Sequence, residues 1–185
     1  VGHPPGAPFF MLVGKFFTLF TSDPTHVARM VNLMSAMFSG LTIMFLFWTI
    51  THLAKKIIVK DEKGISFSQS IVILGSGLVG AMAYAFSGTF WFSAVEGELY
   101  ALSSLVTGIV FWGMLKWEEE ADEPGSGRWM ILIAFIMGLG LGIHRLNLLV
   151  LPVIVFVYYF KKYEVTTKGV IKALVVAVLL LAIVV

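Results

Sequence analysis

Two carboxylates beside an aromatic run are the first candidates for chemistry in this sequence. Glu96 and Glu98 follow the residues FWF in the stretch SGTFWFSAVEGELYALSS. An ionised carboxylate next to a membrane-embedded segment is costly unless it faces water, a cation or a cavity. In a helix, positions two apart diverge by about 200°, so Glu96 would align with Tyr100, whereas an extended loop would put both carboxylates on one side. The pair therefore marks either a binding site or a solvated interfacial loop.

A second polar group, His144, Arg145 and Asn147, interrupts the long apolar run Trp129–Phe160. That run is too long for one membrane span, so we interpret it as two helices joined by a tight vertex. Each arm holds about 15 residues and reaches roughly 22 Å, which is less than the ~30 Å hydrocarbon thickness. The vertex is therefore expected below the membrane surface, where polar groups must line a protein-enclosed or watery cavity.

The chemistry predicted for this vertex is anion binding. Arg145 presents a planar fork of donors that fits a phosphate, and His144 and Asn147 could add hydrogen bonds. In the alternative interpretation, Arg145 snorkels to the interface and the two helices are only short or tilted. The spacing fits both interpretations.

The composition indicates the class of protein that positions these groups. Hydrophobic residues make up 58% of the 185 residues and charged residues 13%. A soluble domain could not hide apolar stretches of about 20 uncharged residues, so the sequence predicts an all-α membrane protein. Cysteine is absent, which excludes disulfides and thiolate metal sites. No nucleic-acid partner is expected, because the net charge is only +2 and the basic residues are explained by membrane orientation.

The apolar runs predict one transmembrane domain, a polytopic helix bundle with about five complete spans and a truncated sixth. Residues 1–26 are expected to form a loop with a surface helix, because FFMLVGKFFTLF is too short to span and should lie along the membrane or pack onto the bundle. Membrane helices are predicted at 27–54, 68–87, 99–117, 129–143, 146–160 and 169–185. Both ends of the chain are abrupt, so we expect an internal piece of a larger protein.

The lysine and arginine residues set the expected orientation. Ten of them flank alternate connections and share one face, which should be cytoplasmic, whereas only Lys15, Arg29 and Arg145 fall on the other. The acidic run EEEADEPGSG, residues 118–127, is then expected to be a solvated cytoplasmic loop rather than a docking site. The outer face carries the opening segment, the carboxylates and the vertex, so all candidate groups converge there.

Two further local signals concern packing and capping. Gly138 and Gly142 form a G-x-x-x-G spacing with Gly140 between them, a pattern typical of close helix packing in membranes. Asp23 precedes Pro24 and predicts a turn or a cap for the next helix. Neither signal is expected to carry chemistry.

Four stretches of the sequence resemble a known family: VGHPPGAPFFMLVGKFF, VNLMSAMFSGLTIMFLFWTITHLAKK, FWFSAVEGELYALS and GLGIHRLNLLVLP. They are similar to multi-pass bacterial membrane proteins of the Bacteroidota type that are related to a eukaryotic transmembrane protein O-mannosyltransferase. The resemblance covers nearly the whole chain. It implies the GT-C fold of membrane glycosyltransferases, a polyprenyl-phosphate sugar donor, and a bacterial inner membrane location with a periplasmic active face. Membrane lipid, the lipid-linked sugar and an exported protein acceptor are the partners it implies.

The resemblance also implies where the catalytic acid lies. The family places an Asp-x-Gly-Glu motif just upstream of its Gly-His-Pro-Pro-Gly stretch, so the general base is expected before Val1 and this stretch alone should be inactive. Where the family's vertex often reads Val-His-Leu-Leu-Asn, this sequence has IHRLN, so Arg145 is a local departure. The sequence identifies no particular cofactor, and a divalent metal could assist.

The expected reaction is inverting transfer of a sugar from a lipid phosphate to a hydroxyl, such as Ser or Thr of an exported protein. His3, His144 or Arg145 would steady the departing phosphate, whose negative charge grows in the transition state. Glu96 or Glu98 would hold sugar hydroxyls or the acceptor.

The alternative class is a transporter or flippase of lipid-linked sugars, or a non-catalytic membrane subunit of an export complex. Broken helices, glycine spacing and a recessed arginine fit a transporter as well. A transport pathway would need polar residues reaching both faces, whereas a transferase concentrates them on one. The asymmetry of the sequence favours the transferase.

Overall fold

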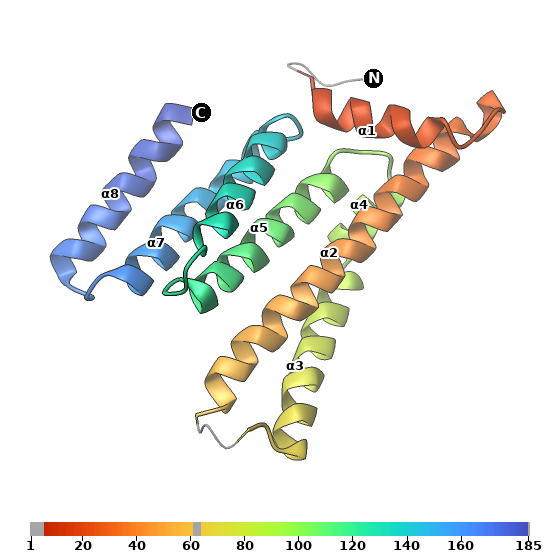
Figure 1. Ribbon diagram of the computed structural model, residues 1–185. Helices are drawn as coiled ribbons and strands as arrows, with labels where there is room; N and C mark the ends of the chain where they lie inside the picture. The colour runs from red at the N-terminus through yellow and green to blue at the C-terminus, as the bar shows by residue number, and fades with distance from the viewer. Residues whose placement is uncertain (1–5, 61–63, 185) are drawn as a thin grey trace.

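The computed structural model describes residues 6–60 and 64–184, and the regular elements in that part of the chain are all helical, as predicted. In order, the helices are α1 (Pro8–Thr18), η1 (Pro24–His26), α2 (Val27–Ile58), α3 (Phe67–Ala85), α4 (Gly88–Val95), α5 (Tyr100–Glu120), α6 (Gly127–Leu141), η2 (Arg145–Val150), α7 (Leu151–Lys162) and α8 (Thr167–Val184). Figure 1 shows α5, α6, α7 and α8 following one another across the bundle, with α2 and α3 on its other side.

Length and composition make the chain a membrane protein. Two helices, Pro24–Ile58 and α3, are long and apolar enough to cross a membrane, and α4 with α5 makes a third span if the bent pair counts as one. At 15 residues, α6 is shorter than a typical span. The predicted count of about five complete spans is therefore not reached by helix length and composition alone.

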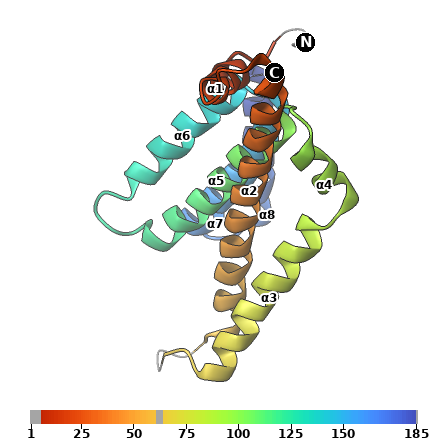
Figure 2. The same cartoon turned by 90° about the vertical axis from the view of Figure 1, so that its right-hand side faces the viewer.

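Helix α2 is the central element of the fold. It packs against α3 and α4 on one side and against α5 on another, and Figure 2 shows α3 and α4 on the side away from α6. Asp23 caps η1, just ahead of α2, because its carboxylate accepts from the Thr25 backbone N–H at 2.8 Å, which confirms the predicted cap. After the connection that follows α2, Ser66 and Gln69 form a capping box at the start of α3.

The chain turns by 115° between α4 and α5, at residues 96–99. The sequence prediction treated residues 88–95 as part of a connection, but the structure folds them into helix α4, with Phe90 buried against Tyr84 at a ring distance of 4.5 Å. Gly97 lets the turn approach α2 closely, since a Cβ there would lie 2.9 Å from the Val31 Cγ1 atom. The turn is therefore fixed against α2 rather than projecting freely.

Helix α1 lies across the end of the bundle where α6 turns into η2 (Figure 1). We call residues 142–147 the vertex and this side of the molecule the vertex end. Phe9, Phe10 and Val13 pack against the buried cluster of Leu102, Leu105, Val106 and Ile143. The Phe9 N–H also donates to the Gly142 carbonyl oxygen at 3.0 Å, which satisfies an N–H that no turn of α1 can satisfy. Of the two predicted placements for this segment, the structure shows packing onto the bundle.

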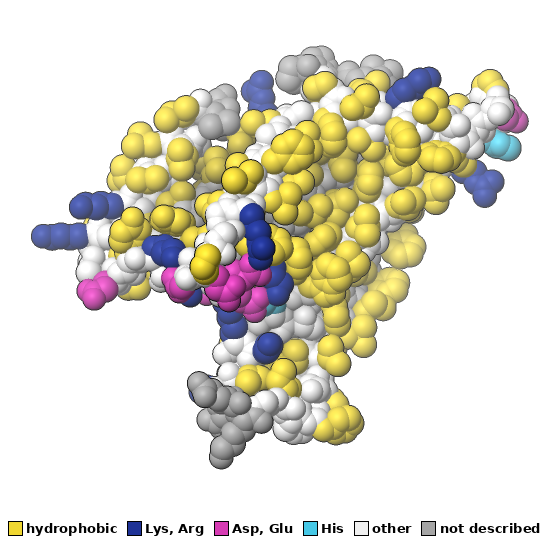
Figure 3. Space-filling model, in the orientation of Figure 1, with side chains coloured by type: hydrophobic (Ala, Val, Ile, Leu, Met, Phe, Trp, Pro, Cys, Tyr) yellow, Lys and Arg dark blue, Asp and Glu magenta, His cyan; other side chains and the backbone are white. Residues whose placement is uncertain are grey.

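The acidic run at residues 118–127 is not the freely solvated loop that the sequence predicted. Glu118–Glu120 are the last residues of α5, and the run pairs with cations from several helices. These pairs are Lys56 with Glu118, Lys116 with Glu119 (2.7 Å), Arg128 with Glu120 (2.7 Å), and Lys161 and Lys162 with Asp122 (3.1 and 2.8 Å). Figure 3 shows these acidic side chains gathered among Lys and Arg side chains, while hydrophobic side chains cover most of the rest of that face. We call this side the charged end.

Candidate functional site

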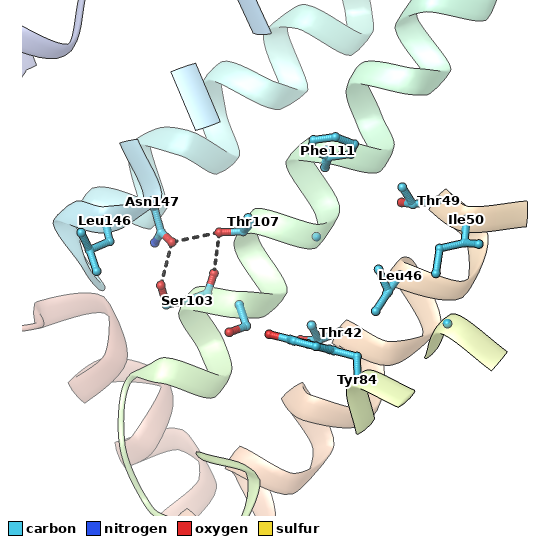
Figure 4. A pocket seen from close by; sticks show the side chains of 13 residues that line it. Thr42, Leu46, Thr49, Ile50, Tyr84, Ser103, Thr107, Phe111, Leu146 and Asn147 are labelled. Atoms are coloured by element: carbon cyan, nitrogen blue, oxygen red, sulfur yellow. Dashed lines mark hydrogen bonds between the residues drawn. The ribbon is translucent and has the colours of Figure 1, made fainter. Parts of the chain in front are cut away.

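The vertex is organised by one buried amide, that of Asn147, which is 1% exposed. Its Oδ1 atom accepts from the Ser103 hydroxyl at 2.7 Å and from the Thr107 hydroxyl at 3.3 Å. Its Nδ2 group donates to the Gly140 carbonyl at 3.0 Å. One side chain of η2 thus joins α5 to the last turn of α6, as Figure 4 shows for the two hydroxyls. A buried amide with these partners is satisfied within the protein.

Glycine allows the close approach that this arrangement needs. A Cβ at Gly140 would lie 3.0 Å from the Val106 Cγ1 atom and 3.1 Å from the Asn147 Nδ2 atom, and a Cβ at Gly142 would lie 3.1 Å from the Phe9 Cβ atom. Gly138, in contrast, has open space around it. The predicted role of glycine in close packing is therefore right for Gly142 and wrong for Gly138, and it belongs chiefly to Gly140.

His144 sits at the tip of the vertex with its ring orientation fixed. Its Nδ1 atom accepts from the Leu146 backbone N–H at 3.2 Å and caps η2. Because Nδ1 is the acceptor, the neutral ring carries its proton on Nε2, which is then available as a donor. The ring centroid lies 5.8 Å from that of Tyr100, which is half-exposed at the start of α5. Arg145 is exposed beside it.

A cavity of about 480 Å³ adjoins the vertex between α2, α3 and α5. We call it the vertex cavity. Its walls are mostly apolar, with Leu46, Ile50 and Phe111 among the lining side chains, and Asn147 and Ser103 stand at one end. Figure 4 shows Thr42 and Tyr84 reaching in from the opposite side. The shape suits an amphiphilic ligand, since an apolar wall meets a small number of hydroxyl and amide groups.

The two predicted carboxylates lie in the turn between α4 and α5, outside any helix. Glu98 lines a second cavity of about 450 Å³, here called the α1 cavity, together with Lys15, Gly14 and Phe10 of α1. Glu96 has extended backbone geometry, with φ −95° and ψ 141°, and does not line that cavity. The structure therefore separates the pair, and Glu98 is the carboxylate that faces a cavity.

The predicted site residues do not form a single site. Tyr100, His144 and Asn147 form one contiguous set at the vertex, with Arg145 exposed at its edge, while Glu98 belongs to the α1 cavity. His3 lies outside the described residues. No cluster of three or more His, Asp or Glu side chains that could hold a metal occurs among the residues the structure describes.

The sequence did not predict Ser103 and Thr107, which complete the vertex, or Lys15, which lines the α1 cavity together with Glu98. A signal for the first two was present, because Tyr100, Ser103 and Thr107 follow a helical spacing that puts polar groups on one face of α5. Lys15 had no comparable signal, since its neighbours in α1 are apolar.

The chain belongs to the family described as the N-terminal domain of the protein O-mannosyl-transferase TMEM260, whose model matches residues 1–167. It is similar to the mouse protein O-mannosyl-transferase TMEM260, with 26% identity over 170 residues that cover 90% of this chain and 22% of the mouse protein. It is also similar to the protein O-mannosyl-transferase tmem260 of Dictyostelium discoideum, with 26% identity over 163 residues that cover 82% of this chain and 18% of that protein. The chain thus spans about a fifth of the length of these relatives. No solved structure matches it.

Proposed function

We propose that this chain is part of a membrane glycosyltransferase that moves a mannosyl group from a polyprenyl-phosphate donor to a Ser or Thr hydroxyl of an exported protein. The observation that carries the proposal is the vertex cavity, whose apolar wall ends at the hydroxyl and amide side chains of Ser103, Thr107 and Asn147. Relatives named protein O-mannosyl-transferases support the class of reaction.

In this proposal the isoprenoid chain lies along Leu46, Ile50 and Phe111, where burying apolar carbon is favourable. The donor phosphate then meets the vertex, where the Nε2–H of His144 and the guanidinium of Arg145 stabilise its negative charge as it leaves. Asn147 has a positioning role, because its amide is hydrogen-bonded to Ser103, Thr107 and Gly140. These bonds hold α5 and α6 in place.

The proposed displacement is balanced by one proton transfer. The acceptor hydroxyl oxygen bonds to the anomeric carbon on the face opposite the phosphate, and the bond from that carbon to the phosphate oxygen breaks. The hydroxyl proton passes to a carboxylate, which we place before Val1 as the family resemblance implies. Glu98, facing the α1 cavity, holds the sugar hydroxyls or the acceptor.

The same proposal includes the GT-C architecture and the outward orientation of the vertex end. It also includes a bundle of about five complete spans and a truncated sixth. With α6 and α7 at 15 and 12 residues, the vertex would lie below the membrane surface, which fits a reaction on a lipid-bound donor. The positive charge gathered at the charged end fits a cytoplasmic location for that end.

The test is a transfer assay on the full-length protein, with polyprenyl-phosphate mannose, a Ser/Thr-containing acceptor peptide and detection of the added hexose by mass spectrometry. We expect His144→Ala and Glu98→Gln to lower the rate at least about tenfold, because each removes a charge-stabilising or positioning contact. Glu123→Gln, at the charged end, is the matched control and should keep the full rate. Full rates in both site variants would refute the assigned roles, and no transfer by the unaltered protein would refute the function.

A further inference from the structure

A third cavity, of about 490 Å³, lies at the charged end between α2, α3 and α5. It is distinct from the vertex cavity and is not used by the proposed reaction. One part of its lining is polar, with His52 and Lys55 from α2 and Lys116 and Glu119 from α5. The other part is apolar and aromatic, formed by Trp48, Trp112 and Leu74 among others. The cavity is therefore amphiphilic.

The side chains that line this cavity carry more positive than negative charge, which favours binding of an anion. Glu119 is already neutralised by Lys116 at 2.7 Å, and the His52 Nδ1 atom lies 3.4 Å from the same carboxylate. Lys55 is exposed and forms no ion pair with any other residue that the structure describes. The His52 side chain is 9% exposed, and its Nε2 atom has no hydrogen-bond partner within the described chain. Among the described residues, Lys55 thus has no ion pair and the buried His52 Nε2 atom has no hydrogen-bond partner.

The aromatic residues indicate the depth of this cavity in the membrane. Trp48 and Trp112 lie with their ring centroids 5.7 Å apart, and tryptophan favours the level of the lipid headgroups. Lys55 follows Trp48 by about two helical turns toward the end of α2. Leu74 is 55% exposed on α3 and Leu78, one turn further toward the vertex end, is 57% exposed. The cavity therefore opens beside an apolar helix face, with its cationic group at the outer edge.

We propose that this cavity binds an anionic phospholipid of the leaflet at the charged end. The phosphate is held by the Lys55 ammonium group, the glycerol ester region lies against Trp48 and Trp112, and an acyl chain runs along Leu74 and Leu78 of α3. A basic pocket between membrane helices that is open to lipid on one side is the arrangement that recognises anionic headgroups. Bound lipid would join α2, α3 and α5, the three helices that line the cavity.

The experiment is a titration of the full-length protein in detergent, in which the unfolding midpoint is followed as phosphatidylglycerol is added. We expect a saturable rise of the midpoint with phosphatidylglycerol, and none with phosphatidylcholine or with inorganic phosphate. Lys55→Gln should raise the lipid concentration needed for half of the effect about fivefold, because one basic group near the headgroup is lost. Lys55→Arg should restore most of the affinity.

The control is Lys168→Gln, which removes an exposed lysine near the start of α8. It should leave the titration unchanged. Equal stabilisation by phosphatidylcholine, an equal effect of inorganic phosphate alone, or an equal loss in Lys168→Gln and Lys55→Gln would each overturn the proposal, since they would show an uncharged lipid contact, a soluble anion or a diffuse basic belt.

Discussion

The vertex end and the charged end join the same two helices, α5 and α6, by different means. At the vertex end, the buried amide of Asn147 accepts from Ser103 on α5 and donates to the Gly140 carbonyl on α6. At the charged end, Glu120 of α5 accepts from the Arg128 guanidinium at 2.7 Å and from the Trp129 indole N–H at 2.8 Å. Neutral hydrogen bonds thus hold one end, and mostly exposed ionic contacts hold the other.

The difference follows from access to water. A buried polar group that loses its partner pays its full desolvation cost, whereas an exposed ion pair gains little because water and salt screen it. The vertex end therefore depends on single atoms in fixed positions, and the charged end depends on several interchangeable contacts. Substitutions should be severe at the vertex and mild at the charged end, and three predictions test that contrast.

The largest effect is expected for Asn147→Leu. The substitution leaves the Ser103 hydroxyl without its partner and removes one of the hydrogen bonds to the Gly140 carbonyl, which keeps those from the Ile143 and His144 N–H groups. We therefore expect a loss of about 2 kcal/mol in the free energy of unfolding. Thermal or denaturant unfolding of the full-length protein in detergent would measure it. Asn32→Leu makes the same change at an exposed position of α2 and should cost far less. Equal losses in the two variants would remove the distinction between the ends.

Smaller effects on the free energy of unfolding are expected for alanine substitutions at two glycines on α6, with opposite signs at the two positions. Gly140→Ala places a methyl group 3.0 Å from the Val106 Cγ1 atom and should destabilise by about 1 kcal/mol. Gly138→Ala meets nothing within 4 Å and should stabilise by about 0.5 kcal/mol, because alanine lowers the entropy of the unfolded chain. Comparison of the two unfolding midpoints is the measurement, and a stabilising Gly140→Ala would show that the vertex is not tightly packed.

The smallest effect is expected at Asp122, on the charged end. Hydrogen bonds from Lys162 and Lys161 hold the pKa of its carboxyl below the ordinary value of 3.8. A carboxyl whose pKa is lowered in the folded state stabilises the protein at pH values above its ordinary pKa. This contribution is lost as the pH falls through the lowered pKa. Unfolding midpoints measured from pH 6 down to about pH 3, a window set by the ordinary Asp value, should fall less steeply for Asp122→Asn. High salt should shrink the difference, and an unchanged acid slope would contradict the assignment.

The sequence predicted the break between α6 and η2 because polar residues there interrupt an apolar run. It did not predict how Asn147 is used, since an amide in a membrane segment suggests a ligand contact just as strongly as an internal hydrogen bond. The choice between the two depends on Ser103 and Gly140, which come from other helices. That information is long-range, and no local pattern contains it.

The same limit explains the errors at the other end and in the α4 region. The sequence showed basic residues on the same side as the acidic run, but the pairing of Lys56 on α2 with Glu118 on α5 depends on helix packing. Helix α4 was missed because its eight residues are flanked by serine and glycine, which predict a connection, while the burial of Phe90 favours the helix. Glu98 reaches a cavity only because α1 covers it.

The hydrogen bond from Phe9 to Gly142 also has a consequence for biogenesis. The acceptor carbonyl is made long after the donor, on the order of ten seconds later at ribosomal rates of about 5–20 residues per second. Until then, α1 has neither its acceptor nor the vertex surface on which Phe10 and Val13 pack. The 11-residue helix α1 can therefore dock only after most of the later helices have been synthesised, and its docking is a late step that completes the vertex end.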